Sequence, residues 1–515
     1  MRGILGAGTN RLNIYVIQKA NVGFAKYIAS LPEGKERGVA IGYDNRHMSY
    51  KFAIESAKVL ATYGIKSYIF ESLRPTPELS FAVRYLKCAG GIMITASHNP
   101  KEHNGYKVYD DTGCQLLPEA ADQVVQYVNE VEDELNIKVF SDEEAYPYMT
   151  WIGEEVDEAY YKEVMAIEVN PGMDKSDFKI VFSPQHGTSN IAVRTCLTRL
   201  GYDLVPVLAQ CAPDPDFSNT KSPNPEVPAS YELAIKKAKE VDADVVVITD
   251  PDGDRLGVVA KHNGEYVLMS GNQSAAVYLE YILSQMKEKG TLPDNAVMYN
   301  TIVTSDLGEL VARSYGVDVE KTLTGFKFIG DKIRKYEQTH EKTFVFGYEE
   351  SYGCVIKDFV RDKDAVQAVL TAAEAGNFYK KQGKDLVDVL NELYAKHGTF
   401  KETQIALSKA GAAGAARIKE IMDNLRKDAP QEIGGVKVVK VEDYGNSTCS
   451  DGTTIQLPKS NVLKYYLEDG SWIAARPSGT EPKCKFYFSI KGSDADDAAS
   501  KTEVFHKAMM EIIGE

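Results

Sequence analysis

The chain has 515 residues, of which 43% are hydrophobic and 26% charged, with a formal net charge of −15. This length suits about three or four domains, and the balance is that of a globular protein able to bury several cores. General nucleic-acid binding proteins are basic, so the acidic charge argues against that class, and any phosphate site must concentrate its cations locally.

Amphipathic helical segments alternate with short apolar runs along most of the chain. Helices are predicted at residues 46–63, 192–200, 271–287 and 364–382, and short strands at 67–70 and 204–207. Such alternation is typical of α/β units with parallel or mixed sheets.

One larger pattern occurs three times. The apolar run 91–95 (GIMIT) leads into ASHNP, the run 244–249 (DVVVIT) into DPDGD, and the run 343–348 (TFVFGY) into EESYG. In open α/β sheets, ligands bind just outside the carboxyl ends of the strands. We therefore predict three related α/β domains, each lending one loop to a shared cleft.

The last part of the chain differs from the rest. Residues 410–416 (AGAAGAA) indicate a helix start or a flexible hinge, and strand-like runs follow at 436–441, 472–475 and 485–490. These features predict a smaller α+β domain at the C-terminus.

An acidic segment without clear periodicity, 129–158, is predicted to be an exposed connection. The resulting domain boundaries are 1–165, 166–268, 269–398 and 399–515.

The seven cysteines are widely spaced and form no C-x-x-C motif. This argues against a disulfide framework or a zinc knuckle and fits a reducing cytoplasm. The N-terminus lacks the apolar core of a signal peptide, and no run approaches the roughly 18 apolar residues of a membrane span. We expect a cytoplasmic protein without membrane association, either a monomer or a homodimer.

Ser97 lies in the motif TASHNP directly after a predicted strand. A serine on a tight, exposed turn has the geometry that a nucleophile needs, and Asn99-Pro100 favours the turn. His98 and Lys107 are nearby candidates for proton transfer. In isolation, an ordinary turn with a capping serine is the better explanation of the motif.

The motif DPDGDR, residues 250–255, is more specific. Alternate positions of an extended loop place Asp250, Asp252 and Asp254 on one side, where their charges require a hard cation such as Mg²⁺ or Ca²⁺. An EF-hand loop also opens D-x-D-x-D-G, but it needs a preceding helix and a glutamate at its twelfth position. Here a strand precedes the loop and Lys261 occupies that position, so the EF-hand interpretation fails.

Two further polar loops contain groups suited to a sugar phosphate. YEESYG, residues 348–353, offers glutamate and serine oxygens to sugar hydroxyls. RPSGTEP, residues 476–482, combines an arginine fork, two hydroxyls and a glycine, which is typical of a phosphate site. Lys327, within TGFKFIG, is a candidate substrate contact. Taken singly, a polar strand end, a hairpin loop and a surface lysine remain open alternatives.

Together these motifs resemble those of the α-D-phosphohexomutases, in the family's order and spacing and over nearly the whole chain. TASHNP resembles the phosphoserine loop, DPDGDR the metal loop, YEESYG the sugar loop and RPSGTEP the phosphate loop. TGFKFIG and the E-x-S-Y-G form of the sugar loop look most like the phosphoglucomutase and phosphopentomutase branch.

The resemblance implies transfer of a phosphoryl group between the 1- and 6-positions of glucose through phospho-Ser97, with glucose 1,6-bisphosphate as intermediate and one Mg²⁺ per chain. The implied metal ligands are the Ser97 phosphate, Asp250, Asp252 and Asp254. The implied catalytic residues are Ser97, His98, Lys107 and Arg255, and the implied substrate contacts are Arg11, Lys327, Glu349, Ser351, Arg476, Ser478, Gly479 and Thr480.

One departure concerns the start of the chain. Relatives in this branch carry several dozen residues before the position that matches Met1, including a Gly-Thr ahead of the turn whose arginine matches Arg2. We therefore expect a truncated sequence or a shorter variant. A phosphopentomutase, an inactive sugar-phosphate sensor and a phosphatase are the competing hypotheses, although a sensor requires neither Ser97 nor the three aspartates, and an enclosed cleft would exclude the water that a phosphatase needs.

Overall fold

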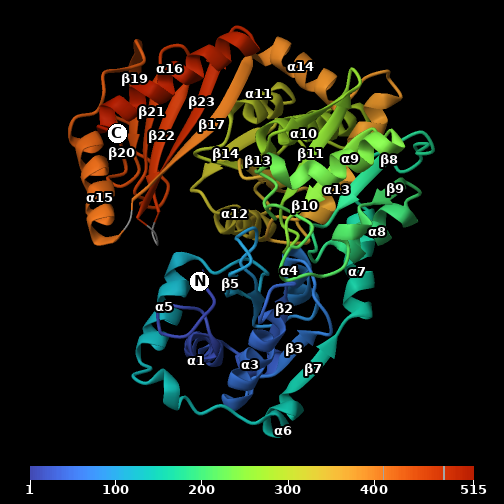
Figure 1. Ribbon diagram of the computed structural model, residues 1–515, viewed down its shortest axis with the longest axis vertical. Helices are drawn as coiled ribbons and strands as arrows, with labels where there is room; N and C mark the ends of the chain where they lie inside the picture. The colour runs from blue at the N-terminus through green and yellow to red at the C-terminus, as the bar shows by residue number, and fades with distance from the viewer. Residues whose placement is uncertain (410, 479–481) are drawn as a thin grey trace. The chain divides into compact units, whose positions relative to one another are not determined.

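The computed structural model describes residues 1–409, 411–478 and 482–515, which form the α/β domains and the separate C-terminal domain predicted from the sequence (Figure 1). The chain divides into two compact units. The first comprises residues 1–300, 315–320 and 325–389, and the second comprises 301–314, 321–324 and 390–515. No helix in the described ranges is both long and apolar enough to cross a membrane.

The first domain has a five-stranded sheet in the order β6-β4-β2-β3-β7. All neighbouring strands are parallel except β6, which runs antiparallel to β4. The strands are β2 (Val39–Tyr43), β3 (Ser67–Phe70), β4 (Gly90–Ile94), β6 (Lys107–Tyr109) and β7 (Met149–Ile152); β1 (Arg2–Ile4) and β5 (His103–Gly105) form a separate pair. The helices are α1 (Ile14–Ser30), α2 (Gly34–Arg37), α3 (Ser49–Thr62), α4 (Thr76–Tyr85), α5 (Pro118–Asn129) and α6 (Asp142–Ala145).

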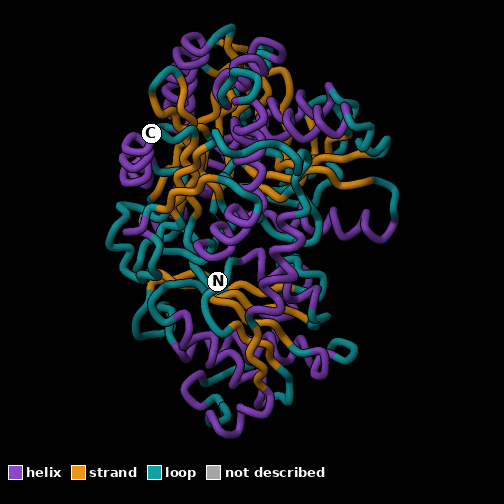
Figure 2. Tube along the Cα trace, turned by 90° about the vertical axis from the view of Figure 1, so that its right-hand side faces the viewer, coloured by secondary structure: helices purple, strands orange, loops and turns teal. Residues whose placement is uncertain are grey.

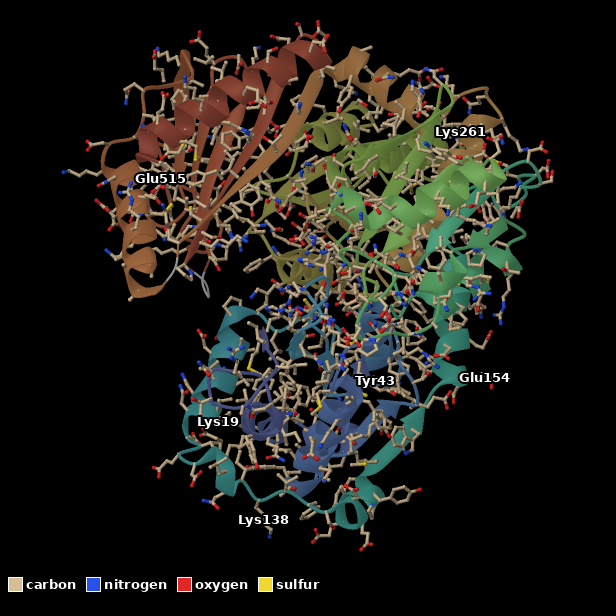
Figure 3. The ribbon with its side chains drawn as sticks, viewed as in Figure 1. Lys19, Tyr43, Lys138, Glu154, Lys261 and Glu515 are labelled. Atoms are coloured by element: carbon tan, nitrogen blue, oxygen red, sulfur yellow. The ribbon has the colours of Figure 1, made fainter. Side chains whose placement is uncertain are left out.

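Side chains alternate between the two faces of this sheet, as the pleat of a strand requires. Ile41 and Ile92 belong to the apolar core that also contains residues of α1 and α3. Gly42, the next residue of β2 after Ile41, lies close to Leu79 of α4 on the opposite face of the sheet. Figure 3 shows Tyr43 within this domain, whereas Lys138 and Glu154 lie at its rim. Helices therefore cover both faces of the sheet.

The interpretation of 129–158 as a mere exposed connection is wrong in part. This segment contains β7, which pairs in parallel with β3 and forms an edge of the sheet, and it also contains α6 and the start of α7 (Glu154–Met165). Only four residues long and half exposed, β7 has too short a pattern to be recognised.

The second domain has the strand order β12-β11-β10-β8-β9. β8, β9 and β10 are parallel, and β11 and β12 form an antiparallel hairpin. The elements are β8 (Lys179–Ser183), α8 (Asn190–Arg199), β9 (Asp203–Pro206), α9 (Glu232–Val241), β10 (Val245–Thr249), β11 (Leu256–His262) and β12 (Glu265–Met269).

The third domain has the order β14-β13-β15-β16, with β13 parallel to β15 and β16 antiparallel to it. Figure 2 shows the strands of the chain in orange and its helices in purple. The elements are α10 (Gly271–Glu288), β13 (Ala296–Thr301), α11 (Asp306–Ser314), β14 (Asp318–Thr322), α12 (Phe326–Thr339), β15 (Thr343–Glu349), β16 (Gly353–Val355), α13 (Ala365–Lys380) and α14 (Leu386–His397).

The C-terminal part of the second unit is an antiparallel sheet in the order β17-β23-β22-β21-β19-β18, with β20 paired to β19. α15 and α16 contribute apolar residues to the core of this sheet. The segment 411–416 is the start of α15, so of the two alternatives for this stretch the helix start holds, with Ala410 outside the described residues. The elements are β17 (Thr399–Ser408), α15 (Gly411–Lys427), β18 (Glu432–Ile433), β19 (Val436–Asp443), β20 (Thr448–Cys449), β21 (Leu463–Leu467), β22 (Trp472–Pro477), β23 (Lys483–Gly492) and α16 (Ala495–Ile513).

Candidate active site

Three strand ends in the first unit bring their loops together. β4 leads to Ser97, β10 leads to Asp250 and β15 ends at Glu349. The Ser97 hydroxyl donates a hydrogen bond of 2.8 Å to Asp250 Oδ2. The Leu256 N–H, which follows the metal loop, donates to the Tyr352 carbonyl of the sugar loop at 2.9 Å. The carboxyl ends of strands from three domains thus meet, as the sequence pattern predicts.

Ser97 lies on a tight turn but is buried, with an exposed fraction of 1%, so the prediction of an exposed turn is wrong. Its φ angle of 53° is in the left-handed region, which non-glycine residues rarely adopt. The Thr95 hydroxyl accepts the Ser97 N–H at 2.7 Å, and His98 Nδ1 lies 3.2 Å from Ser97 Oγ. The hydroxyl is thereby aimed between Asp250 and His98.

The metal loop is a compact turn and not the extended segment that the sequence suggested. The Gly253 N–H donates to the Asp250 carbonyl at 3.0 Å, and Gly253 has a φ of 67° that suits glycine. The N–H groups of Asp254 and Arg255 both donate to Asp250 Oδ1. The turn folds the carboxylates onto one another instead of spacing them along a strand.

The three aspartates have the chemistry of a site for a hard divalent cation. Asp250, Asp252 and Asp254 are buried, and one oxygen from each lies within 4.8 Å of the others. The Oδ1 atoms of Asp252 and Asp254 have no hydrogen-bond partner among the described residues. Burial, followed by the charges of Asp252 and Asp254, raises the pKa of Asp250 well above its usual value. Buried, unpartnered oxygens and crowded charges are what a bound cation relieves.

Two lysines face the other oxygens of this cluster. Lys107 Nζ lies 2.8 Å from Asp252 Oδ2 and 3.4 Å from Asp254 Oδ2. Lys363 Nζ lies 3.1 Å from the same Asp254 oxygen and 3.3 Å from Asp362 Oδ1. Although burial opposes it, the carboxylates raise the pKa of both lysines, so both are cationic.

Lys363 was not identified from the sequence. It lies just before α13 in the segment RDKD, whose alternating charges resemble an ordinary solvated turn. Gly353 leaves room for it, because a Cβ there would lie 2.0 Å from Lys363 Cδ. The glycine of the sugar loop thus leaves room for the side chain of Lys363.

Thr76 was also missed by the sequence analysis. Its hydroxyl donates to Asp252 Oδ2 at 2.9 Å, and its N–H donates to the Asp252 carbonyl at 2.8 Å. Thr76 begins α4 of the first domain, whereas Asp252 belongs to the second. It orients this carboxylate so that Oδ2 faces donors and Oδ1 remains open.

Arg255 and His98 flank the cluster. Arg255 Nη1 donates to Glu226 Oε1 at 2.6 Å, which fixes the guanidinium beside the loop. Burial, with the charges of Arg255 and Arg2, lowers the pKa of His98 well below its usual value. His98 is therefore neutral at neutral pH.

The predicted sugar-binding residues lie at the third strand end. Glu349 is buried, and its Oε1 accepts the Gly325 N–H at 2.7 Å, which ties the sugar loop to the start of α12. Ser351 is half-buried two residues further along the loop. Lys327 is half-buried in the first turn of α12, with Nζ 5.4 Å from the Phe328 ring centroid.

The remaining predicted substrate contacts come from other parts of the chain. Arg11 is exposed in a loop whose carbonyls at Gly6, Gly8 and Arg11 accept the Asn13 side-chain amide. Arg476 and Ser478 lie at the end of β22 in the second unit, where the Ser478 N–H donates to the Lys483 carbonyl at 2.7 Å. Gly479 and Thr480 lie outside the described residues.

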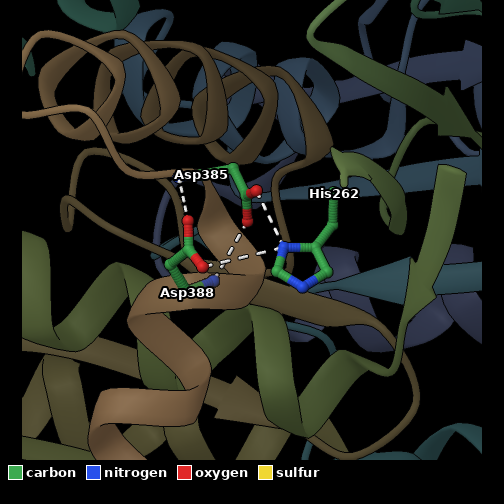
Figure 4. A group of neighbouring side chains, drawn as sticks. All are labelled: His262, Asp385 and Asp388. Carbon is green, nitrogen blue, oxygen red and sulfur yellow. Dashed lines mark hydrogen bonds and ion pairs between the residues drawn. The ribbon is translucent and has the colours of Figure 1, made fainter. Parts of the chain in front are cut away.

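A second group with metal-ligand geometry joins β11 to the start of α14 (Figure 4). His262 Nδ1 lies 2.8 Å from Asp385 Oδ2 and 3.7 Å from Asp388 Oδ1. All three side chains are partly exposed. Asp385 Oδ1 accepts the N–H groups of Val387 and Asp388, and Asp388 Oδ2 accepts that of Asp385. These carboxylates thus cap the start of α14 and also contact the histidine.

The sequence matches the phosphoglucomutase/phosphomannomutase family over four successive segments. These are α/β/α domain I at residues 1–135, α/β/α domain II at 158–264, α/β/α domain III at 270–397 and the C-terminal domain at 415–507.

Curated relatives and solved structures agree with this match. A phosphoglucomutase from Staphylococcus epidermidis is 39% identical over 97% of this chain and 91% of its own length, and one from Staphylococcus aureus is 39% identical over 97% and 90%. The fold resembles that of a phosphoglucomutase from Paramecium, with a TM-score of 0.72, 19% identity and coverage of 100% and 95%. The fold also resembles that of a phosphoglucomutase/phosphomannomutase family protein from Burkholderia thailandensis, with a TM-score of 0.72 and 19% identity. That match covers 99% of this chain and 96% of the other. The chain belongs to the α-D-phosphohexomutase family, whose phosphoglucomutase and phosphomannomutase members share these four domains.

Proposed function

We propose that this protein is a phosphoglucomutase, which interconverts glucose 1-phosphate and glucose 6-phosphate, and that it belongs to the phosphoglucomutase and phosphopentomutase branch. The observation that carries the proposal is the contact between the buried Ser97 hydroxyl and the aspartate cluster, at 2.8 Å from Asp250. The 39% identity to curated phosphoglucomutases along nearly the whole chain supports the choice of glucose.

The reaction is a two-step exchange. Phospho-Ser97 transfers its phosphoryl group to the free hydroxyl of the sugar phosphate: the Ser97 O–P bond breaks, a sugar O–P bond forms, and the proton of the sugar hydroxyl passes to a base. The product, glucose 1,6-bisphosphate, turns around in the site. Its other phosphoryl group then returns to Ser97, whose proton goes to the leaving sugar oxygen. Such transfers depend mainly on positioning and on neutralisation of charge.

The residues present fit a Mg²⁺ ion. Asp250, Asp252 and Asp254 would hold it, together with an oxygen of the Ser97 phosphate, and the ion would supply charge neutralisation for a phosphoserine that carries about −1.5 to −2. The open Oδ1 atoms of Asp252 and Asp254 support this assignment.

The surrounding side chains divide the remaining work. Lys107 is our candidate for the general acid or base, with His98 beside Ser97 as the alternative. Arg255, held by Glu226, is placed to stabilise the transferring phosphoryl group. Lys363 adds a second cation beside Asp254.

Substrate recognition would use the two polar loops. Glu349 and Ser351 would bind the vicinal hydroxyls of the sugar, with Lys327 and Arg11 as further contacts. Arg476, Ser478, Gly479 and Thr480 would hold the distal phosphate, whichever end of the bisphosphate occupies that position.

Two assignments about the whole chain accompany this proposal. We retain the domain boundaries at 165/166, 268/269 and 398/399.

All seven cysteines lie within the described residues as buried free thiols, which supports a reducing compartment such as the cytoplasm.

The alternatives are a phosphopentomutase and an inactive sugar-phosphate sensor. A coupled assay on purified protein with glucose 1-phosphate, ribose 1-phosphate and mannose 1-phosphate, with and without glucose 1,6-bisphosphate, separates them. We expect the largest kcat/KM with glucose 1-phosphate and activation by the bisphosphate. Preferred turnover of ribose 1-phosphate would reassign the enzyme to pentoses, and absence of turnover with all three sugars would favour the sensor.

A further inference from the structure

The loop that carries Ser97 wraps around a single buried guanidinium. Arg46, from the turn between β2 and α3, has an exposed fraction of 3%. Its Nη2 donates to the Ser97 carbonyl at 2.6 Å and to the Asn99 carbonyl. Its Nη1 donates to the carbonyls of Pro100 at 2.8 Å and His103 at 3.1 Å. Four carbonyls of one short segment therefore converge on one side chain.

The four N–H groups of the two terminal nitrogens all have acceptors, whereas Nε makes an ion pair but no hydrogen bond among the described residues. The two terminal nitrogens use their four N–H groups on the loop, and Nε lies 3.3 Å from Asp44 Oδ2. The other Asp44 oxygen accepts the Ser49 hydroxyl at 2.6 Å and the Arg46 N–H at 3.0 Å, which fixes the carboxylate. A lysine at position 46 has three donors on a single nitrogen, so it keeps the charge but not the fork.

This arrangement determines the direction in which Ser97 points. Ser97 adopts a φ of 53°, a conformation that a serine does not keep without support from its surroundings. Its carbonyl is held by Arg46 and its N–H by Thr95. With both sides of the residue fixed, the hydroxyl is directed at Asp250.

The second domain covers the other side of Arg46. The Phe217 ring centroid lies 5.1 Å from the guanidinium carbon, and Phe217 is 5% exposed with a φ of 51°. The neighbouring Asn45 amide donates to the Asp214 carbonyl at 2.9 Å. The domain that supplies Asp250 thus also braces the residue that holds Ser97.

We propose that Arg46 is a positioning residue for phosphoryl transfer and that Phe217 is its brace from the second domain. Arg46 uses the N–H groups of its terminal nitrogens on the loop carbonyls, so it acts through the position of Ser97. It holds the left-handed turn of Ser97 in register with the metal ligands, so that the serine oxygen occupies the same place before and after each transfer. This inference rests on the proposed phosphoserine mechanism.

The other end of β4 provides a matched comparison. There Arg37 donates to the carbonyls of Lys87 at 3.1 Å and Cys88 at 2.9 Å, and Lys87 also has a left-handed φ, of 56°. This arginine also binds loop carbonyls, although it is partly exposed and also pairs with Asp111 at 3.0 Å. Its loop precedes β4 and carries none of the proposed site residues. Arg37→Lys is therefore the control for loss of an arginine clamp as such.

The test compares Arg46→Lys and Phe217→Leu with Arg37→Lys in the full-length protein. We measure kcat and KM for glucose 1-phosphate with added Mg²⁺, the fraction of Ser97 phosphorylated by glucose 1,6-bisphosphate, and hydrogen exchange of residues 95–104. Because misplacement by about 1 Å can lower a rate about 100-fold, we expect Arg46→Lys to lower kcat by roughly 10- to 100-fold with KM changed by less than about 3-fold. Phe217→Leu should lower kcat less, and Phe217→Tyr, which keeps the ring face, should recover most of it.

Exchange in residues 95–104 should accelerate in Arg46→Lys, while Arg37→Lys keeps the wild-type kcat and exchanges faster only before β4. A kcat unchanged in folded Arg46→Lys would overturn the proposal, as would equal losses of kcat in the two arginine variants.

If the wild-type chain did not turn over hexose phosphates, the proposed function would fail. Exchange and Ser97 phosphorylation would still report on the clamp, and unchanged values of both in Arg46→Lys would overturn it. If Arg46→Lys did not fold, the test would be the comparison of kcat between Phe217→Leu and Phe217→Tyr. Equal kcat values in these two variants would contradict the proposal that Phe217 braces Arg46.

Discussion

Two groups of side chains in the first unit have ligand atoms close enough together for a metal site, and they differ in burial and in the hydrogen bonds of their carboxylates. Asp250, Asp252 and Asp254 are fully buried and keep two oxygens without a hydrogen-bond partner among the described residues. His262, Asp385 and Asp388 are partly exposed, and their carboxylates accept backbone N–H groups of α14. Proximity of ligands alone therefore does not define a catalytic metal site; in the first group it is combined with burial and with oxygens that have no donor among the described residues.

Removal of metal should show the largest difference between the two groups. We expect EDTA to abolish mutase activity and Mg²⁺ to restore it, because three buried carboxylates beside a phosphoserine require a divalent cation. A His262→Asn variant should show the same loss and the same recovery. Full activity in metal-free buffer would remove the role given to the buried group.

Single substitutions test the comparison residue by residue. Asp252→Asn keeps the size of the side chain but removes a ligand charge, and we expect kcat/KM to fall at least about 100-fold, the upper range for disturbed metal sites. Asp388→Asn, the matched change in the exposed group, should leave kcat/KM within about 2-fold, since surface substitutions away from a site are usually nearly neutral. Similar losses in both variants would contradict the distinction.

Glu349 is a buried carboxylate outside the metal loop, so it separates sugar recognition from metal binding. Loss of a charged hydrogen bond costs about 1.5–3 kcal/mol, or roughly 10- to 100-fold in kcat/KM. We expect Glu349→Ala to lose this much with glucose 1-phosphate and a different amount with ribose 1-phosphate, whose hydroxyls are placed differently. Arg476→Ala should harm both sugars alike, because each presents the same distal phosphate. Equal losses of kcat/KM for both sugars in Glu349→Ala would mean that this loop does not distinguish one sugar from another.

The smallest effect concerns the stability role of the exposed group. Asp385 caps α14 and also holds His262, so Asp385→Ala should lower the free energy of unfolding by about 1 kcal/mol without changing kcat. Asp385→Asn retains a capping side chain and is the control. Thermal unfolding followed by circular dichroism compares the two, and a large loss of turnover in Asp385→Ala would show that the group reaches the active site after all.

The sequence predicted those features that depend on local order. A buried strand followed by a polar loop occurs at Ser97, Asp250 and Glu349, and the structure places these three strand ends together. The turn within DPDGD was not foreseen, because an alternating acidic pattern fits an extended loop as well as a compact one.

Residues that act over a long separation in the sequence were missed for a different reason. Thr76 contacts Asp252 from 176 positions away, and Arg46 holds Ser97 from 51 positions away. Neither has a local pattern that distinguishes it from a helix start or a surface arginine. Their roles follow only from the topology that brings β2, β4 and β10 to a common edge of the site.

The central claim is that Ser97 carries the phosphoryl group during turnover. The most direct measurement is tandem mass spectrometry of the wild-type protein and of Ser97→Ala after incubation with glucose 1,6-bisphosphate and Mg²⁺, together with turnover of both proteins. We expect one phosphate on Ser97 in the wild-type protein, none in Ser97→Ala, and a loss of kcat of at least about 1,000-fold in a variant that remains folded. Normal turnover by Ser97→Ala, or phosphate on another residue in the active wild-type protein, would contradict the account.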